Sequence, residues 1–249
     1  MHVGKYKIAG LTVQIESIYP EVHTLCQDYR CADDVVAQIS IHTTQKQIRA
    51  EQEKSDQEAI LEGKTPVAYE DPYLETLAVY RQMAKTMLME HDVLLFHGSV
   101  IAVEDQAVLF TAKSGTGKST HTGLWRQMLG DGCYMVNDDK PLLRVSEEQT
   151  EACGTPWRGK ANLGTNCIVP LKAICILKRG ETNQIRPVAA KDVLPMLVQQ
   201  SFRAEDPRTM LKLLHILDKM AKNVKLFVMQ CNMDPEAAKV AYEATLGNN

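Results

Sequence analysis

One short glycine-rich segment constrains the fold of this chain more than any other feature. Residues 112–119 read Ala-Lys-Ser-Gly-Thr-Gly-Lys-Ser, which matches the phosphate-loop pattern with alanine in place of the commoner glycine at its first position. An apolar run at residues 107–110 precedes this segment, and a helix is expected behind it at residues 120–129. In that order of strand, loop and helix, backbone N–H groups and the positive end of the helix surround nucleotide phosphates.

The residue types within this loop each have a chemical role in binding ATP and Mg²⁺. Gly115 and Gly117 let the backbone close around the phosphates, because glycine adopts conformations that other residues avoid. Lys118 is expected to contact the β and γ phosphates, and the Ser119 hydroxyl is expected to ligate Mg²⁺. An accidental glycine-rich turn is the alternative; the relaxed pattern arises by chance in roughly 2% of chains of this length. The predicted nucleotide-binding residues are Lys113, Ser114, Gly115, Thr116, Gly117, Lys118, Ser119 and Thr120.

Two adjacent carboxylates, Asp138 and Asp139, follow the next predicted strand at residues 133–136. One loop, one helix and one strand separate them from Lys118, so they are expected to emerge on the nucleotide's side of the sheet. One carboxylate can hold Mg²⁺ while its neighbour accepts the proton of an attacking hydroxyl. We assign Asp138 as the base and Asp139 as the metal ligand, although the two roles are exchangeable. The alternative is a solvated turn, since Asn-Asp-Asp-Lys-Pro has ordinary turn chemistry.

Further cations and histidines are candidates to complete the site. His97 ends a buried strand just before the loop-bearing hairpin, where contacting phosphate and a structural role are both open. Lys160 or Arg158 could stabilise charge on the transferred phosphoryl oxygens, unless they are ordinary exposed cations. Arg203 is a weaker candidate of the same type, and His121 is expected to lie on a helix surface. The predicted catalytic residues are Asp138, Lys118, His97 and Lys160.

The strands around the loop predict a mixed α/β fold. Residues 100–103 and 107–110 form two short apolar runs around a tight polar connection, which predicts an antiparallel hairpin. Dinucleotide-binding folds place a parallel strand before their glycine loop, so a hairpin there indicates a mixed sheet and another lineage. Residues 66–249 are predicted to form this phosphate-loop core.

Residues 1–65 are predicted to be an N-terminal β-rich subdomain or extension. Residues 5–15 and 35–42 are β-like, whereas residues 44–64 are polar without an apolar face and are expected to form a solvated segment or loop. A long helix is expected from Asp71, with Asp71 as N-cap and Pro72 at its first position.

Net charge, hydropathy and cysteine content indicate which partners and which cellular compartment to expect. A formal charge of −3 gives no general attraction to nucleic acid or to an anionic membrane, and no apolar run is long enough to span a bilayer. The N-terminus has no signal-peptide pattern, so a cytoplasmic protein is expected. The seven cysteines are an odd number without zinc-ligand spacing, which indicates reduced thiols. A homo-oligomer is possible.

Three segments together resemble a known family. FHGSVIAV, LFTAKSGTGKST and MVNDDKPL are similar to the catalytic domain of HPr kinase/phosphorylase and its relatives, which share a nucleotide-binding fold with phosphoenolpyruvate carboxykinases. The resemblance covers roughly residues 93 to 180 and implies a mixed-sheet core of that type. It also implies that the first aspartate acts as acid and base, with Ser119 and the second aspartate near Mg²⁺.

The N-terminal region, the loop of residues 154–160 and the C-terminal region look more like a divergent branch of that family, which includes kinases of lasso-peptide precursors. Other relatives phosphorylate free serine. The glycine-rich signature of the bifunctional enzymes does not follow the aspartate pair, and the chain is too short for a carboxykinase. We therefore expect an ATP-dependent kinase acting on a hydroxyl of serine in a peptide, protein or small molecule. A phosphoserine phosphorylase or phosphatase of the same lineage is one alternative, and a non-catalytic nucleotide-sensing module is another.

Overall fold

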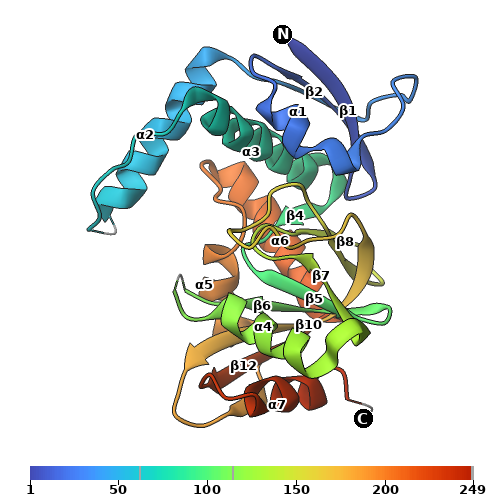
Figure 1. Ribbon diagram of the computed structural model, residues 1–249, viewed down its shortest axis with the longest axis vertical. Helices are drawn as coiled ribbons and strands as arrows, with labels where there is room; N and C mark the ends of the chain where they lie inside the picture. The colour runs from blue at the N-terminus through green and yellow to red at the C-terminus, as the bar shows by residue number, and fades with distance from the viewer. Residues whose placement is uncertain (62, 114, 248–249) are drawn as a thin grey trace. The chain divides into compact units, whose positions relative to one another are not determined.

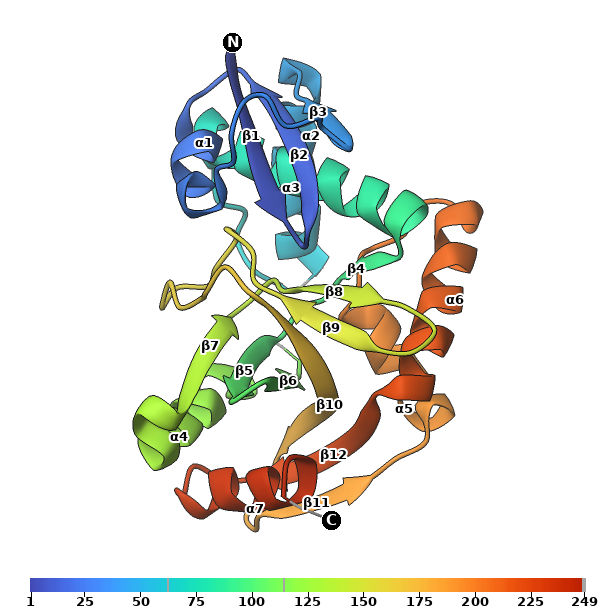
Figure 2. The same cartoon turned by 90° about the vertical axis from the view of Figure 1, so that its right-hand side faces the viewer.

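The computed structural model describes residues 1–61, 63–113 and 115–247. It divides into two compact units, Met1–Thr86 and Met87–Asn249, which Figures 1 and 2 trace from blue to red. The division between the units falls within the long helix α3 (Asp71–His91). The first part of α3 lies in the N-terminal unit because its side chains bond to that unit.

The N-terminal unit contains a small sheet among its described residues. Strands β1 (His2–Ile8) and β2 (Leu11–Ser17) form an antiparallel hairpin, and β3 (Ile39–His42) pairs parallel to β2. Ala9 and Gly10 join the hairpin with φ values of 51° and 79°, the pattern of a tight two-residue turn. The sequence predicted one β-like segment over residues 5–15, and this turn divides it into two strands. Helix α1 (Glu21–Leu25) and the 3₁₀ helix η1 (Gln27–Tyr29) follow the hairpin.

The polar segment expected to be a loop is instead the helix α2 (Gln45–Leu61), so that prediction was wrong. Its glutamate, glutamine, lysine and alanine residues are good helix formers, and propensity supports the helix where an apolar stripe does not. The Gln52 side chain donates to Asp56 one turn later, at 2.6 Å. Glu51 is buried and forms a two-point contact with Arg81 of α3, at 2.8 and 3.0 Å. That contact fastens the helix to its own unit.

Glu75 of α3 holds the N-terminal sheet to the helix. Its side chain is fully buried, and its two carboxylate oxygens accept the backbone N–H groups of Ile18 and Tyr19 at 2.7 and 2.8 Å. The Thr43 hydroxyl donates to the same carboxylate. Hydrogen bonds to a charged group are stronger than those between neutral groups. Glu75 therefore satisfies backbone donors from the end of β2 that would otherwise be buried without acceptors.

The described residues of the second unit form a nine-stranded mixed sheet with the path β4-β8-β9-β10-β6-β5-β7, and with β12 and β11 continuing from β10. Strand β10 pairs antiparallel to β9 through its first residues and parallel to both β6 and β12 further along. It therefore joins the two parts of the sheet. The strands are β4 (Val93–Leu95), β5 (Ser99–Val103), β6 (Gln106–Thr111), β7 (Cys133–Asn137), β8 (Leu142–Val145), β9 (Thr150–Cys153), β10 (Ile168–Arg179), β11 (Gln184–Pro187) and β12 (Lys225–Cys231).

The directions of the strands determine which strand ends lie together at one edge of this sheet. The predicted hairpin is present: β5 pairs antiparallel to β6, with Ser99 opposite Phe110. On its other side, β5 pairs antiparallel to β7, with Val100 opposite Asn137. Strands β6, β7 and β10 consequently run the same way, and their carboxyl ends share an edge with the amino end of β5.

Helices cover this sheet and complete its core. They are α4 (Lys118–Leu129), α5 (Ala190–Gln199), α6 (Pro207–Asn223) and α7 (Glu236–Thr245). Helices α4 and α7 pack side by side, as Figure 1 shows. Their buried core holds Phe110 and Trp125 edge to face, with ring centroids 5.3 Å apart, and Tyr242 packs on Trp125 at 5.7 Å. These contacts fix α4, and with it the loop that begins it, against strand β6.

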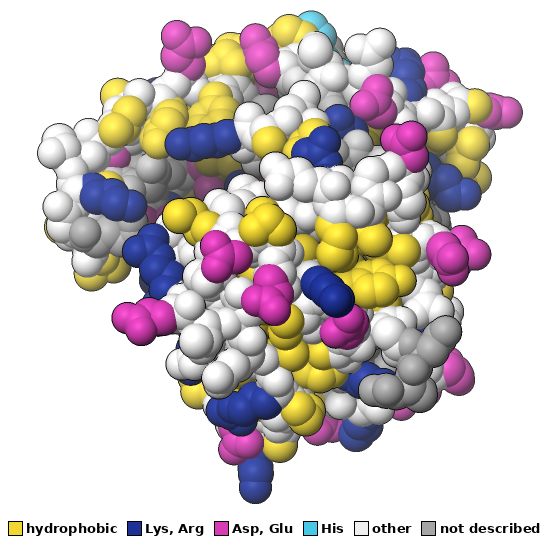
Figure 3. Space-filling view, turned by 60° about the horizontal axis from the view of Figure 1, so that its bottom comes forward, with side chains coloured by type: hydrophobic (Ala, Val, Ile, Leu, Met, Phe, Trp, Pro, Cys, Tyr) yellow, Lys and Arg dark blue, Asp and Glu magenta, His cyan; other side chains and the backbone are white. Residues whose placement is uncertain are grey.

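On the face drawn in Figure 3, lysine and arginine side chains are interspersed with aspartate and glutamate side chains rather than gathered into one patch. Within the described ranges, every helix is too short or too polar to cross a bilayer.

Candidate active site

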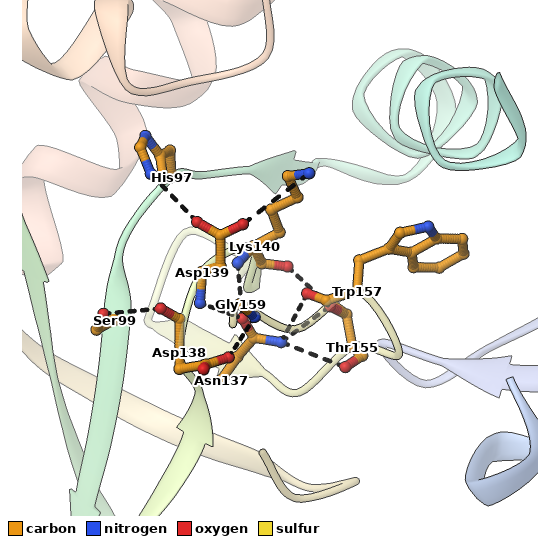
Figure 4. Close-up of polar contacts among 9 residues, drawn as sticks. All are labelled: His97, Ser99, Asn137, Asp138, Asp139, Lys140, Thr155, Trp157 and Gly159. Carbon is orange, nitrogen blue, oxygen red and sulfur yellow. Dashed lines mark hydrogen bonds and ion pairs between the residues drawn. The ribbon is translucent and has the colours of Figure 1, made fainter. Parts of the chain in front are cut away.

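Hydrogen bonds fasten the start of β5 to the end of β7. The Gly98 N–H donates to the carbonyl of Asp139 at 3.0 Å, and the Ser99 hydroxyl donates to the carbonyl of Asp138 at 2.9 Å. Figure 4 draws the Ser99 contact beside the two carboxylates. The backbone of the aspartate pair is therefore held by β5 and does not behave as a free surface turn.

The same end of β5 is fastened to the end of β6. The Thr111 hydroxyl donates to the carbonyl of His97 at 2.9 Å. A Cβ added to Gly98 would lie 2.9 Å from the Phe110 carbonyl oxygen and 2.8 Å from Cδ2 of Leu109. Glycine follows the histidine because only a residue without a side chain lets the two backbones approach so closely. The glycine loop, which follows Thr111, thus starts beside His97.

The loop itself has the backbone conformation that its glycines predict. Gly115 and Gly117 have φ values of 76° and 116°, and a Cβ added at either would meet nothing within 4 Å. Glycine is required there by backbone conformation, since no crowding excludes a side chain. The Thr116 N–H and hydroxyl both donate to the Lys113 carbonyl, at 3.2 and 2.8 Å, and close a turn. Ser114, predicted to bind nucleotide, lies outside the described residues.

Helix α4 presents its amino end immediately after this turn. The first-turn N–H groups of Lys118, Ser119 and Thr120 have no intrahelical acceptors, since the first such bond runs from His121 to Gly117 at 2.9 Å. Ser119 and Thr120 are exposed, and Lys118 is half-buried. Burial lowers the pKa of Lys118, and the nearby Asp139 carboxylate partly opposes that shift. The amine is therefore near enough to Asp139 for the two charges to interact.

Asp139 lies close to the side chains of His97 and Lys140. Its Oδ1 lies 3.2 Å from Nε2 of His97, and its Oδ2 lies 3.9 Å from Nζ of Lys140. Burial acts to raise the pKa of Asp139, but the hydrogen bond from His97 and the charges of Lys140, His97 and Lys118 outweigh it, so the pKa lies below its ordinary value. Asp139 is thus an ionised carboxylate on the loop side of the pair.

Asp138 points toward a different partner. Its Oδ1 accepts the backbone N–H of Gly159 at 2.6 Å. A Cβ added to Gly159 would lie 3.1 Å from Oδ2 of Asp138 and 3.2 Å from Cβ of Asp139, so this position leaves little room for a side chain. Figure 4 shows the two carboxylates diverging, Asp139 toward His97 and Asp138 toward Gly159. This divergence gives the two aspartates different environments.

Asn137 organises the turn that carries both aspartates. It is fully buried, and its Oδ1 accepts the N–H groups of Asp139 and Lys140 at 2.9 and 2.7 Å. Its Nδ2 donates to the carbonyl and hydroxyl oxygens of Thr155 at 3.2 and 3.0 Å, and to the carbonyl of Trp157 at 3.3 Å. The sequence analysis did not select Asn137 as a site residue. The signal for it was its place in a turn, because asparagine side chains often accept hydrogen bonds from the backbone of their own turn.

The remaining sequence candidates lie at different distances from this centre. Lys160 is exposed and directly follows Gly159, the partner of Asp138. The side chain of Arg158 lies against Gly164, whose added Cβ would be 3.0 Å from Nε of Arg158. Arg203 is exposed in the segment between α5 and α6.

The expected position of His121 on a helix surface was wrong. Only 2% of His121 is exposed; its ring lies 4.6 Å from that of Phe110, and its Nε2 accepts the Trp125 N–H at 3.3 Å. Helix α4 packs this face on the sheet, which the short helical pattern did not reveal. Burial lowers the pKa of His121 to about 4, so the ring is neutral near pH 7.

Arg179, which the sequence did not single out, also contacts the loop. It ends β10, and its Nη2 donates to the carbonyl of Gly115 at 2.6 Å. The parallel pairing of β10 with β6 places the end of β10 beside the loop.

The side chains near the loop suit Mg²⁺, which needs few protein ligands, better than they suit a metal ion whose ligands all come from the protein. No group of three or more His, Cys, Asp or Glu side chains able to hold a metal occurs among the described residues. Magnesium needs fewer protein ligands, because it keeps several waters and uses substrate phosphates to complete its shell. Asp139 and Ser119 offer a carboxylate and a hydroxyl of that kind. All seven cysteines are free thiols.

The described second unit is a mixed α/β structure on a mixed sheet, with a glycine loop and a carboxylate pair at one edge. Among solved structures, the chain is similar to the Hpr(Ser) kinase/phosphatase from Coxiella burnetii, with 10% identity, a TM-score of 0.36, and coverage of 61% of this chain and 96% of that chain. This is a distant likeness of fold, and the functional proposal below stands on the residues of this chain. No family model matches the sequence, and no curated protein matches it.

Proposed function

We propose that this chain is an ATP-dependent kinase that transfers the γ-phosphoryl group to a hydroxyl, with serine of a peptide, a protein or a small molecule as the acceptor class. The observation that carries the proposal is the shared edge of the sheet. Strands β6 and β7 run the same way on either side of β5, so the phosphate loop and the aspartate pair leave the sheet together. A solvated turn and an accidental glycine turn would have no reason to meet there.

The loop and the amino end of α4 bind the nucleotide phosphates in this proposal. Backbone N–H groups of the loop and of Lys118, Ser119 and Thr120 face the phosphate oxygens, and the helix adds its positive end. The Lys118 amine contacts the β and γ phosphates and neutralises charge that develops during transfer.

Asp139 and Ser119 would hold Mg²⁺, which would neutralise negative charge on the nucleotide phosphates when bound. The surroundings of Asp139 suit that role, because neighbouring cations keep its pKa below the ordinary value. His97 donates to Oδ1 of Asp139 and orients this carboxylate toward the loop.

Asp138 is the base. It accepts the proton of the acceptor hydroxyl as that oxygen bonds to the γ phosphorus and the bond to the β–γ bridging oxygen breaks, which releases ADP. The Gly159 N–H holds Oδ1 of Asp138, and in this proposal Oδ2 takes the acceptor proton. Lys160, next to Gly159, lies on the acceptor side and stabilises charge on the phosphoryl oxygens.

Labelled ATP-Mg²⁺ incubated with free serine, serine-containing peptides and a protein panel tests this proposal. We expect transfer by the unmodified protein. Asp138→Asn should retain nucleotide binding by calorimetry but lose at least a hundredfold in transfer, the range for general bases. Lys118→Ala should weaken binding and nearly abolish transfer.

Two results would overturn the proposal. Tight ATP binding without transfer to any acceptor would indicate a nucleotide-sensing module. Removal of phosphate from phosphoserine that depends on added phosphate or pyrophosphate, without forward transfer from ATP, would indicate a phosphorylase. Unchanged transfer by Asp138→Asn would remove that residue from the role of base.

A further inference from the structure

The carboxyl end of β10 brings a guanidinium beside the phosphate loop. Ile176 of β10 lies opposite Thr111 of β6 in parallel register, so Arg179 extends beyond the point where the loop leaves β6. Its side chain is exposed, and Nη2 donates to the carbonyl of Gly115 at 2.6 Å. The two residues are 64 positions apart in sequence, so this contact exists only through the sheet.

This hydrogen bond fixes one peptide group of the loop from its carbonyl side. The carbonyl of Gly115 and the N–H of Thr116 belong to the same planar peptide and point in opposite directions. Arg179 holds the carbonyl, while the N–H donates to the Lys113 carbonyl at 3.2 Å. With both ends held, the peptide cannot rotate without breaking a hydrogen bond.

Rotation of that peptide is the motion that glycine at residue 115 would otherwise allow. Gly115 has a φ of 76° and an added Cβ there would meet nothing within 4 Å, so packing does not restrain it. A rotated peptide would turn its carbonyl oxygen to the side on which its N–H now lies. An oxygen in that position would repel phosphate, whereas N–H groups attract it.

Arg179 is available for this contact. Among the described residues it forms no ion pair with a carboxylate, and neither does its neighbour Lys178. Arg179 and Lys178 are consecutive residues of β10, so their side chains point to opposite faces of the sheet. In the described chain, the Lys178 side chain forms no hydrogen bond to the loop. Lys178 therefore provides a matched control: equal charge and adjacent position without the contact.

We propose that Arg179 is a positioning residue of the phosphate loop: its guanidinium holds the Gly115 carbonyl outward and so shapes the loop for phosphate before a nucleotide arrives. The inference rests on the proposed function in that the loop is taken to bind ATP. Preorganisation of this kind increases affinity because less ordering is needed on binding.

The first test uses the full chain without nucleotide. Amide hydrogen exchange across residues 112–118 is measured by mass spectrometry for the unmodified protein, Arg179→Ala and Lys178→Ala. We expect Arg179→Ala to exchange roughly three- to tenfold faster in this segment, as the loss of one exposed charge-assisted hydrogen bond implies. Lys178→Ala should match the unmodified protein. Equal exchange in all three proteins would overturn the proposal.

The second test measures the dissociation constant of ATP-Mg²⁺ by calorimetry at low and high salt. Arg179→Ala should weaken binding roughly three- to tenfold at both salt concentrations, because a local hydrogen bond is screened less than a distant charge. Arg179→Lys should recover part of the loss, and Lys178→Ala should stay within twofold. In turnover assays, Arg179→Ala should raise KM for ATP more than it lowers kcat.

The outcomes separate this inference from the proposed function. If Lys178→Ala weakens binding as much as Arg179→Ala, and both effects fade in high salt, Arg179 contributes only general attraction and the positioning role is refuted. If the unmodified protein binds no ATP, the proposed function fails, while the exchange result still decides whether Arg179 holds the loop.

Discussion

Replacing Asn137 with alanine would remove the side chain that ties the aspartate turn to the loop of residues 155–159. Five hydrogen bonds are lost: two to the N–H groups of Asp139 and Lys140, and three to oxygens of Thr155 and Trp157. An unsatisfied buried donor costs about 1–3 kcal/mol. Both donors belong to half-buried residues, so water can satisfy them in part, and we take the lower end of that range for each. With the small cavity added, the expected loss of unfolding free energy is about 3 kcal/mol.

A second variant, Asn137→Asp, keeps the size of the side chain and changes only its chemistry. A carboxylate can still accept from Asp139 and Lys140, but it places an oxygen against the carbonyls of Thr155 and Trp157 where Nδ2 now donates. We expect a loss of stability comparable to that of alanine, and a greater loss of transfer activity because a third carboxylate is added beside the phosphates.

Urea denaturation followed by circular dichroism gives both stabilities, and ATP turnover is measured on folded protein. In a double-mutant cycle with Thr155→Val, the coupling energy should reach about 0.5–3 kcal/mol, the range for residues in one hydrogen-bond network. If both Asn137 variants stay within about 0.5 kcal/mol of the unmodified protein, the value expected of an ordinary surface site, the reasoning about this turn is wrong.

Three further perturbations test other parts of the molecule by the same denaturation assay. Glu75→Gln turns an amide N–H₂ toward the donors of Ile18 and Tyr19 and should cost about 2–4 kcal/mol; a change below about 0.5 kcal/mol would contradict its anchoring role. Burial lowers the pKa of His121 to about 4. As the pH falls, His121 of the unfolded chain is therefore protonated before His121 of the folded protein. The stability contributed by the neutral ring is full above pH 6.5 and falls by about 2 kcal/mol at pH 5, so His121→Phe should show a smaller loss of stability between pH 7.5 and pH 5 than the unmodified protein does. Gly98→Ala forces a Cβ to within 2.9 Å of the Phe110 carbonyl and should cost about 1–3 kcal/mol, whereas Gly123→Ala on α4, where an added Cβ meets nothing within 4 Å, should be neutral or stabilising; equal effects of the two changes would count against the close approach at Gly98.

Patterns within short stretches of sequence were good predictors of structure. The predicted long helix is present as α3, which begins at Asp71, one residue before the expected first helical position, and the hairpin of β5 and β6 delivers the glycine loop. The positive φ values of Gly115 and Gly117 follow from the same logic, because the conformations open to glycine are a local property. Each of these features depends on neighbours along the chain.

Segments with a weak local signal were missed or misread. Strands β9 and β11 have four residues each and carry polar side chains, so neither gave a clear alternating pattern. Helix α2 has almost no apolar face. Its helix propensity is a local property of the sequence, whereas its contact with Arg81 depends on the tertiary structure. The hairpin of β1 and β2 depended on a two-residue turn at Ala9, a residue that rarely adopts positive φ.

Local sequence patterns predicted a glycine loop between a strand and a helix, and two carboxylates after the next strand. Whether these segments meet depends on the three-dimensional fold, because strand order and direction are set by pairing between residues far apart in the chain. The register of β7 on β5, and of β5 on β6, brings Asp139 to His97 and to Lys118. The contact of Arg179 with Gly115 and the burial of His121 have the same origin. Both depend on how one segment packs against another. The periodicity of a sequence indicates which face of a segment is apolar, but it does not indicate which other segment that face contacts.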